Sequence, residues 1–210
     1  MARRIRKRSY FTSWGQDNAD HDFTHGNGLR DTPWGYLISF RHLSQIALLR
    51  KKNLKKIWSV GSSADNDFIA SGKARFDFQH SPIIDKNKNL ILFDNGFSQK
   101  RSRILALRLK GKKAHFVWQF PKKSPYFSKD RGSIVAVNNG NLLAYFVSPN
   151  VIGEQEKPTT RSDYLIEFNP ENQEELGKMQ VIFFTKSPGY RAIPLDSINT
   201  DNYLKSLPFP

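Results

Sequence analysis

The sequence repeats one pattern of short apolar runs three times, and this repeat constrains the fold more than any single motif. Each unit is anchored on an apolar run at Leu37, Leu90 or Leu142, and successive anchors lie about 53 residues apart. One further run precedes each anchor and two follow it. Turns rich in Asn, Gly, Pro or Lys separate the runs, as in hairpins. Each unit is therefore predicted to form four antiparallel strands.

The length of the repeat indicates the architecture, because four antiparallel strands in about 50 residues are typical of a propeller blade. We predict an all-β protein, a partial β-propeller that follows a basic N-terminal segment at residues 1–19. About three blades are expected, at residues 20–63, 73–122 and 130–190. Their innermost strands are expected at residues 23–29, 76–84 and 132–137. The alternative is a β-sandwich whose internal similarity is accidental.

Three blades do not close a ring, because closed propellers have at least about four. One expectation is that the chain is a piece of a longer protein that contains the other blades. The other is that its open blade edges pair with a second copy, since unpaired edge strands tend to bind other strands. That second expectation is a homodimer.

The formal net charge of +14 means that the surface attracts anions. Nucleic acid, an acidic membrane surface and a small phosphate or sulfate compound are all anionic partners of this kind. Part of the charge lies in residues 2–8, and the rest is spread over turns such as Lys51-Lys52, where it is ordinarily only solvated. No recognisable helix or stacking motif accompanies it, so nucleic acid is not the expected partner.

Several classes of function are excluded by what the sequence lacks. The chain has no cysteine, so disulfides and thiol chemistry are excluded and the redox compartment is left open. No apolar run follows the basic start and no long apolar run occurs elsewhere, so neither a signal peptide nor a membrane span is expected. The five histidines are not at ligand spacing, and no phosphate-binding Gly loop is present. We therefore expect no metal and no cofactor.

Two histidines, His25 and His80, fall on strands that are expected to be innermost. Innermost strands line the channel of a propeller, so their side chains converge there. Two histidines and an arginine such as Arg101 could donate charge-assisted hydrogen bonds to a tetrahedral anion. Asp22 stands near His25 in the sequence and could fix its tautomer. The simpler interpretation is that each histidine is an ordinary strand residue without a site.

The other polar residues nearby have structural interpretations. Asn95-Gly96 predicts a tight turn, because the pair supplies a positive φ angle, and this turn could direct Arg101 inward. His42 is expected to point away from the channel. Arg103 is expected to brace a neighbouring blade, and His115 to lie on an outer strand.

Several motifs are shared with one known family. They are Asp22-Phe23-Thr24-His25-Gly26-Asn27, similar to an Asp-Trp-x-His-x-Asn segment; Ser39-Phe40-Arg41-His42; Phe78-Gln79-His80; Phe93-Asp94-Asn95-Gly96; Ser102-Arg103; Val117-Trp118-Gln119-Phe120; and Gly189-Tyr190-Arg191-Ala192. With them the chain resembles the C-terminal half of the bacterial arylsulfotransferases, six-bladed propellers that move a sulfuryl group between phenols. The resemblance covers most of residues 20–195, and the Gln-His and Phe-Asp-Asn-Gly pair is its most specific part.

The resemblance implies a sulfate site at the mouth of the channel, where family members use histidines and an arginine and one histidine carries the group transiently. His25 and His80 match the family's two histidines on innermost strands and are the implied catalytic residues. Arg101 matches the arginine beyond Phe-Asp-Asn-Gly, and Asn27 and Arg41 are implied as further substrate-binding residues. The family's third histidine, its nucleophile, has no counterpart after His80.

The activity that the resemblance implies is sulfuryl transfer from a phenolic sulfate ester to a phenol, through a histidine intermediate and without a nucleotide donor. Aryl sulfates and phenols would be the partners. Because half of the blades and the third histidine lack counterparts, the chain by itself is expected to be incomplete or inactive. The alternative is a non-catalytic propeller module that binds an anion or a protein. The family is typically exported whereas this chain shows no signal, so the compartment is left open.

Overall fold

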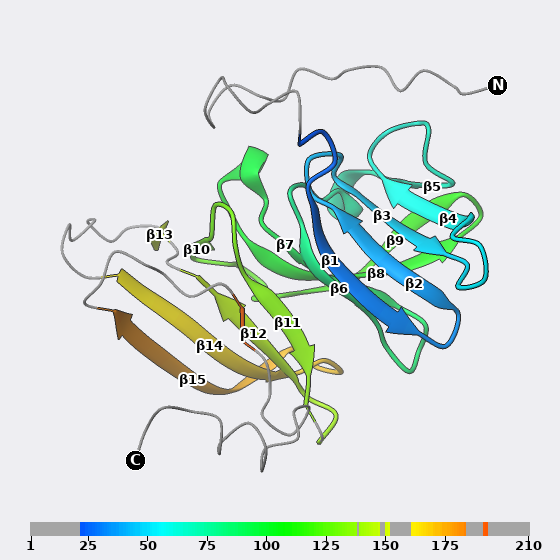
Figure 1. The fold of residues 1–210 in the computed structure, drawn as a ribbon. Coiled ribbons are helices and arrows are strands. Elements are labelled where there is room, and N and C mark those ends of the chain that lie inside the picture. Colours follow the sequence, from blue (N-terminus) through cyan, green and yellow to red (C-terminus); the bar gives the residue numbers. More distant parts are fainter. Residues whose placement is uncertain (1–21, 138, 148–149, 152–160, 184–190, 193–210) are drawn as a thin grey trace, which may run out of the picture.

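The computed structural model describes residues 22–137, 139–147, 150–151, 161–183 and 191–192. Within these residues the chain forms β-strands and two short 3-10 turns, η1 (Gly72–Ala74) and η2 (Phe97–Gln99), and no α-helix (Figure 1). The predicted all-β class is confirmed. In this described part, no helix is long and apolar enough to cross a membrane.

Most of the strands form three antiparallel meanders. The first contains β1 (Gly26–Thr32), β2 (Gly35–Phe40), β3 (Gln45–Leu49) and β4 (Lys56–Gly61). The second contains β6 (His80–Ile84), β7 (Leu90–Asp94), β8 (Arg103–Lys110) and β9 (Lys113–Phe120). The third contains β11 (Ser133–Ala136), β12 (Leu142–Phe146), β14 (Arg161–Asn169) and β15 (Glu174–Phe183). Successive strands of each meander pair antiparallel, as the repeat predicts.

A short strand that the sequence pattern does not reveal joins the first two meanders. β5 (Phe68–Ala70) pairs in parallel with β4 on one side and with β9 on the other. The first two meanders thereby form one sheet in the order β1-β2-β3-β4-β5-β9-β8-β7-β6. The third meander is a separate sheet, and β10 (Tyr126–Phe127) pairs with β13 (Asn150–Val151). A strand as short as β5 is too short for an alternating pattern to appear.

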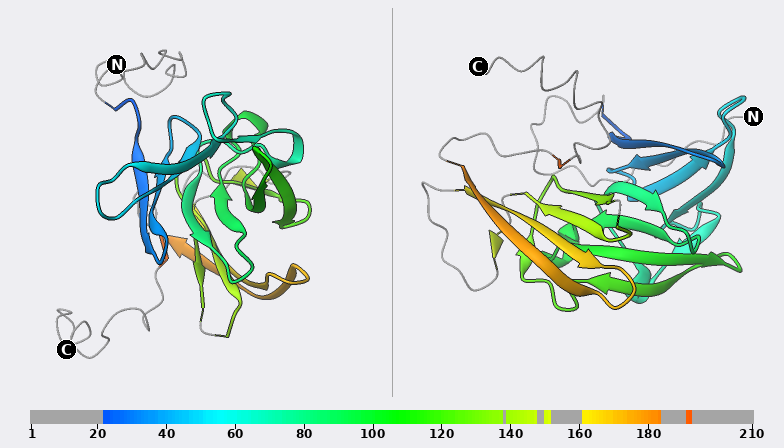
Figure 2. Two further views of the ribbon diagram at one scale, coloured as in Figure 1. Left: turned by 90° about the vertical axis from the view of Figure 1, so that its right-hand side faces the viewer. Right: turned by 90° about the horizontal axis from the view of Figure 1, so that it is seen from below.

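The second meander packs against both of the others, and Figure 2 shows the arrangement of the three from two further sides. β7 shows how the sequence produces this arrangement. Leu90 and Leu92 pack in a cluster with residues of the first meander, whereas Ile91 and Phe93 pack in a cluster with residues of the third. Successive residues of a strand point to opposite faces, so a strand that is covered on both faces is apolar throughout.

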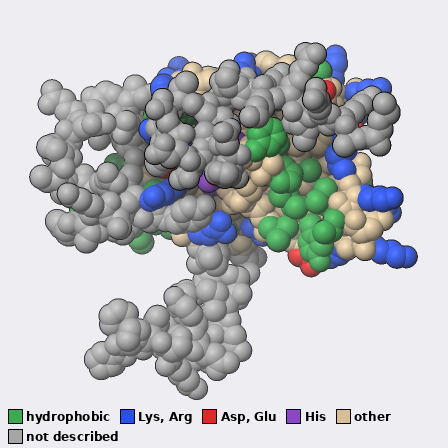
Figure 3. Space-filling view, turned by 45° about the horizontal axis from the view of Figure 1, so that its top comes forward, with side chains coloured by type: hydrophobic (Ala, Val, Ile, Leu, Met, Phe, Trp, Pro, Cys, Tyr) green, Lys and Arg blue, Asp and Glu red, His purple; other side chains and the backbone are tan. Residues whose placement is uncertain are grey.

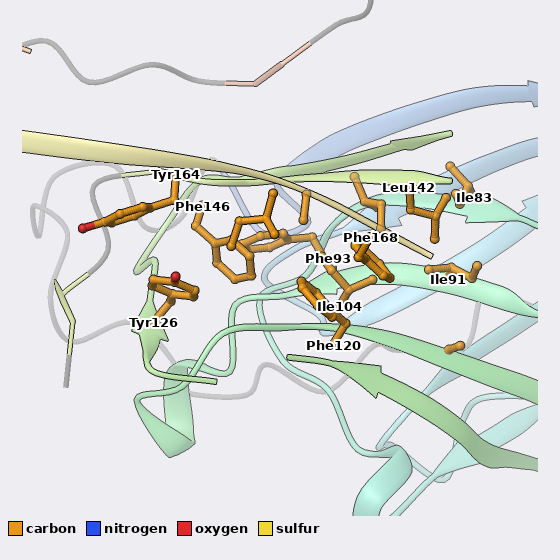
Figure 4. Packing of buried hydrophobic residues seen from close by; sticks show 14 residues of the cluster. Ile83, Ile91, Phe93, Ile104, Phe120, Tyr126, Leu142, Phe146, Tyr164 and Phe168 are labelled. Atoms are coloured by element: carbon orange, nitrogen blue, oxygen red, sulfur yellow. The ribbon is translucent and has the colours of Figure 1, made fainter. Parts of the chain in front are cut away.

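Aromatic rings dominate the cluster between the second and third meanders (Figure 4). The ring centroids of Phe93 and Phe146 are 5.2 Å apart, and those of Phe120 and Phe168 are 4.0 Å apart in a parallel stack. Each buried ring removes a large apolar area from water, so these side chains contribute strongly to holding the two sheets together.

The first strands of the first two meanders begin later than predicted. They were expected at residues 23–29 and 76–84, but β1 begins at Gly26 and β6 at His80. His25 and Phe78 have φ angles of 45° and 56°, which a strand does not allow. Both strands also carry a β-bulge near their starts. Irregular backbone of this kind often occurs at functional sites, where it redirects side chains.

Candidate functional site

The polar residues that the sequence singles out meet at one end of the first two meanders. His25 precedes β1 and Arg41 follows β2, the strand with which β1 pairs. His80 opens β6 and Asn95 follows β7, the strand with which β6 pairs. β1 also packs on β6, and a Cβ added at Gly28 would meet a β6 side chain at 3.3 Å. This close packing brings together residues that are far apart in the sequence.

His80 is buried, with 2% of its surface exposed. Its Nδ1 lies 2.8 Å from Oδ1 of Asn95. Burial above all, followed by the charges of Arg41 and His25, lowers the pKa of His80 to about 4, although hydrogen bonding to Asn95 and to the backbone of Phe78 acts in the opposite direction. His80 is therefore uncharged at neutral pH.

Arg41 supplies a buried positive charge that acts on His80. Its guanidinium carbon lies 4.5 Å from the centre of the Phe78 ring, which is a cation–π contact. Nη2 donates to the carbonyl of Lys129 at 3.5 Å, and the Arg41 backbone N–H donates to the carbonyl of His25 at 3.0 Å. A buried guanidinium that is positioned in this way is suited to binding an anion.

Two further imidazole rings lie together near the site, those of His25 before β1 and of His42 after β2. Asp22 accepts a hydrogen bond from the His25 backbone N–H at 3.0 Å, and its other carboxylate oxygen contacts Nδ1 of His25. The His42 ring stacks on the His25 ring with a centroid distance of 4.5 Å. The expected contact of Asp22 with His25 is confirmed. The short turn after β2 places the His42 ring against His25, while its expected orientation away from a channel stays a prediction.

Asn27 joins the first meander to the segment that precedes His80. It is buried on β1, and its Nδ2 donates to the carbonyl of Gln79 at 2.8 Å. Its Oδ1 has no hydrogen-bond donor among the described residues. A buried acceptor without a donor is costly, so a ligand that carries a hydroxyl group would be favoured at this position.

The two arginines after β7 lie in different surroundings. Arg101 has an exposed side chain, and its backbone N–H donates to the carbonyl of Gly96 at 3.2 Å. Its contact with a sulfate group stays a prediction. Arg103 donates to a carboxylate oxygen of Asp94 at 3.0 Å and to Oε1 of Gln119 at 2.6 Å, so it braces three neighbouring strands. Among Arg41, Arg101 and Arg103, the charge that lowers the pKa of His80 is that of Arg41.

Sequence reasoning missed two residues of the site, His42 and Asn95. Asn95 was interpreted only as part of a turn, but it is fully buried. The signal that could have revealed it is its position close behind the apolar run at residues 90–93 of β7, which ends in Asp94. Polar residues that end a strand covered on both faces are themselves covered, and a buried amide needs partners.

One group of described residues brings potential metal ligands together, because Asp22, His25 and His42 each place one ligand atom within 4.8 Å of the others. Both Nδ1 atoms already have oxygen partners on Asp22. The charge of Arg41 also acts on His42. The charge of Arg41 would weaken the binding of a metal cation here, whereas the Asp22 carboxylate would favour it.

Gly96 is required by the backbone that leads from Asn95 into η2. Its φ angle is 58°, and an added Cβ would lie 1.9 Å from the carbonyl oxygen of Arg101. We expect Gly96→Ala to lower the free energy of unfolding by more than about 3 kcal/mol. Gly111→Ala is the matched control, because its φ is 57° with nothing within 4 Å of the added Cβ. It should cost only about 1 kcal/mol. Equal losses in urea unfolding would contradict this account of Gly96.

The lowered pKa of His80 predicts acid destabilisation. Between the ordinary pKa of histidine and about 4, the unfolded chain binds a proton at this residue and the folded chain does not. The stabilising contribution is therefore complete above about pH 6.5 and is lost as the pH falls toward 4, which amounts to about 3 kcal/mol. Urea unfolding at neutral pH and at about pH 4 measures this loss. It should be smaller in His80→Asn, and an equal loss in both proteins would refute the prediction.

The comparisons with known proteins point to one family. The sequence profile described as Arylsulfotransferase (ASST) matches residues 3–163, a range that includes the site residues His25, Arg41, His80 and Asn95. No curated protein matches the sequence. A crystal structure of a protein of unknown function from Bacteroides caccae has 13% identity and a TM-score of 0.45, and the alignment covers 75% of this chain and 46% of that chain. The present chain thus spans less than half the length of that protein. Because the family profile matches more than half of the sequence, the chain belongs to the arylsulfotransferase family.

Proposed function

We propose that this site transfers a sulfuryl group from an aryl sulfate ester to a phenol and that His80 carries the group between them, in place of the third family histidine that has no counterpart in this chain. The observation that supports this most is the buried, uncharged imidazole of His80 under the influence of the positive charge of Arg41. A neutral imidazole has a lone pair for attack on sulfur, and a guanidinium binds the negative oxygens of a sulfate ester. Membership of the family supports aryl sulfates and phenols as the substrate class.

The proposed transfer has two displacement steps. In the first, an imidazole nitrogen of His80 attacks sulfur, an N–S bond forms, and the phenolate leaves with the electron pair of the S–O bond. In the second, the oxygen of a phenol acceptor attacks sulfur, the N–S bond breaks, and the proton of the acceptor passes to a base or to water. His80 then returns to its starting state, so one difficult displacement is divided into two easier ones.

The neighbouring residues have proposed roles in binding the ester. Arg41 would stabilise the charge on the sulfuryl oxygens, and His25, whose Nδ1 is held by Asp22, would donate from Nε2 to the same oxygens when its ring is protonated on both nitrogens. The buried Oδ1 of Asn27 would accept the hydrogen of the phenol. Arg101 would contact the ester only from the exposed side of the site, where its side chain lies.

We also propose that the three meanders are propeller blades, at residues 20–63, 73–122 and 130–190. The stacking of the second meander between the other two supports this assignment. A second support is the position of β6, which contacts both β1 and β11. These are the first strands of the three meanders, and contacts among first strands are expected when they surround a common channel.

A ring of this kind needs further blades, and we propose that a second copy of the chain supplies them. The outward face of the first meander is apolar, since Leu29 pairs with Ile38, Tyr36 pairs with Leu49, and Leu29 is 71% exposed. Figure 3 shows apolar side chains gathered on this side of the molecule. Light scattering after size-exclusion chromatography should give twice the mass of the chain. A monomer at every concentration would contradict the dimer.

Mass spectrometry tests the proposed function directly. The wild-type chain is incubated with a nitrophenyl sulfate ester in the absence of an acceptor. We expect release of nitrophenolate and a gain of one SO₃ group on the peptide that contains His80, and a phenol added later should remove the group. His115, which lies exposed on β9, is the internal control and should stay unmodified.

The alternative, a non-catalytic module that binds an anion, predicts a different result in the same experiment. Neither nitrophenolate nor a modified peptide would form, but calorimetric titration with the ester would detect binding. Binding would then be lost in Arg41→Gln, because the charge that attracts the anion is removed. That combination of results would refute the transferase proposal.

A further inference from the structure

We propose that Asn95 is a positioning residue that holds His80 in the tautomer with the hydrogen on Nδ1 and the lone pair on Nε2. This inference rests on the proposed sulfuryl transfer, because the tautomer decides which ring nitrogen can attack sulfur. Asn95 does not touch the substrate in this proposal. It acts through His80.

Two backbone carbonyls fix the orientation of the Asn95 amide. Asn95 is fully buried, and its Nδ2 donates to the carbonyl of Ser128 at 2.8 Å and to that of Arg131 at 2.9 Å. Both hydrogens of the amide are therefore used. If the amide rotated by half a turn, its oxygen would face two carbonyl oxygens in a buried place, which is costly. The amide oxygen is thus held on the side of His80.

The amide oxygen can only accept a hydrogen bond. Nδ1 of His80 lies 2.8 Å from Oδ1 of Asn95, and an amide oxygen has no hydrogen to donate. The hydrogen between the two atoms therefore belongs to Nδ1. Because burial lowers the pKa of His80 to about 4, the ring carries only this one hydrogen at neutral pH. Nε2 then retains its lone pair.

The backbone on both sides of this contact is also held in place. Oγ of Ser102 donates to the Asn95 carbonyl at 2.8 Å and accepts from the Ser128 N–H at 2.8 Å. Ser128 and Arg131 lie between β10 and β11, where the chain enters the third meander. The segment that enters the third meander therefore sets the tautomer of a histidine in the second.

An amide is suited to this role in a way that a carboxylate is not. A carboxylate at the same distance would also accept from Nδ1, but its negative charge would favour the protonated ring. A protonated imidazole has no lone pair and cannot attack sulfur. Asn95→Asp is therefore the informative substitution, because it keeps the size of the side chain and the acceptor oxygen while adding a charge.

Nitrogen NMR of protein labelled in its histidines tests the inference. In the wild type at neutral pH, Nδ1 of His80 should have the chemical shift of a protonated nitrogen and Nε2 that of an unprotonated one. In Asn95→Asp the pH at which His80 titrates should rise by at least about 2 units. The transfer rate at neutral pH should fall about 10- to 100-fold and recover as the pH is raised. A merely structural role of Asn95 would not move the titration of His80.

Asn95→Ala is the second variant, in which the acceptor is lost and both tautomers of His80 should appear. The signals of His115 should be the same in all three proteins. A hydrogen on Nε2 in the wild type, or an unchanged His80 titration in Asn95→Asp, would overturn the inference. The wild-type spectrum decides the first point even if a variant does not fold. These spectra need no substrate, so the expected tautomer without any sulfuryl transfer would contradict the proposed function and support the positioning of His80.

Discussion

His80→Asn is expected to reduce sulfuryl transfer at least about 10³-fold while the protein stays folded. In the proposed mechanism, the substitution removes the ring nitrogen that attacks sulfur, so the first displacement has no nucleophile. Asparagine is the suitable replacement because its amide nitrogen can occupy the place of Nδ1 and donate to Oδ1 of Asn95, the present partner of His80. The buried polar contact is preserved. The initial rate of nitrophenolate release in the presence of a phenol acceptor measures the effect.

His115→Asn is the matched control for this experiment. It makes the same chemical change on an exposed residue of β9, and it should leave the rate close to that of the wild type. If His80→Asn kept a rate within about tenfold of the wild type, the sulfuryl group would have to be carried by another residue. The circular dichroism spectra of both variants should match the wild type, which separates lost chemistry from lost structure.

Phe93→Ala is expected to lower the free energy of unfolding by about 4 kcal/mol. Phe93 is fully buried between the second and third meanders and packs on Phe146. A Cβ added at Gly132 would lie 2.5 Å from a carbon of the Phe93 ring, which shows how closely the chain surrounds this ring. β7 is paired on both sides and cannot move to close the gap, so truncation leaves a cavity.

Phe116→Ala provides the comparison for this prediction. Phe116 lies on β9 with 37% of its surface exposed, so its truncation creates no cavity and should cost less than about 1 kcal/mol. Equilibrium unfolding in urea, monitored by Trp fluorescence, gives both values. A loss in Phe93→Ala no larger than that in Phe116→Ala would be incompatible with the packing of these two sheets.

Much of the fold could be predicted from the sequence because strands have a local signature. The repeat predicts four antiparallel strands in each of three units, and the apolar run of β7 indicates a strand covered on both faces. The starts of β1 and β6 were wrong. Non-glycine residues with positive φ, such as His25 and Phe78, give no reliable signal in a sequence. β5 was missed because its pairing partners in β4 and β9 are set by packing, which a local pattern does not contain.

The candidate site was only partly predictable. His25, Asn27, Arg41 and His80 were chosen from motifs, and the structure places them at one end of the first two meanders, while their roles in a site stay predictions. Arg101 was chosen for its closeness in sequence to Phe-Asp-Asn-Gly, but its side chain is exposed, and its role stays a prediction.

The sequence by itself determines the β class and the repeat, and it shows which histidines and arginines are present. These properties depend on composition and on spacing within one unit. The chemical state of His80 cannot be read in this way. Its burial depends on the packing of β6 against β1 and β11, and its tautomer depends on carbonyls of Ser128 and Arg131 that lie in another part of the chain. Desolvation and hydrogen-bond partners are properties of the packed molecule, so the tertiary structure decides whether this histidine is a neutral nucleophile.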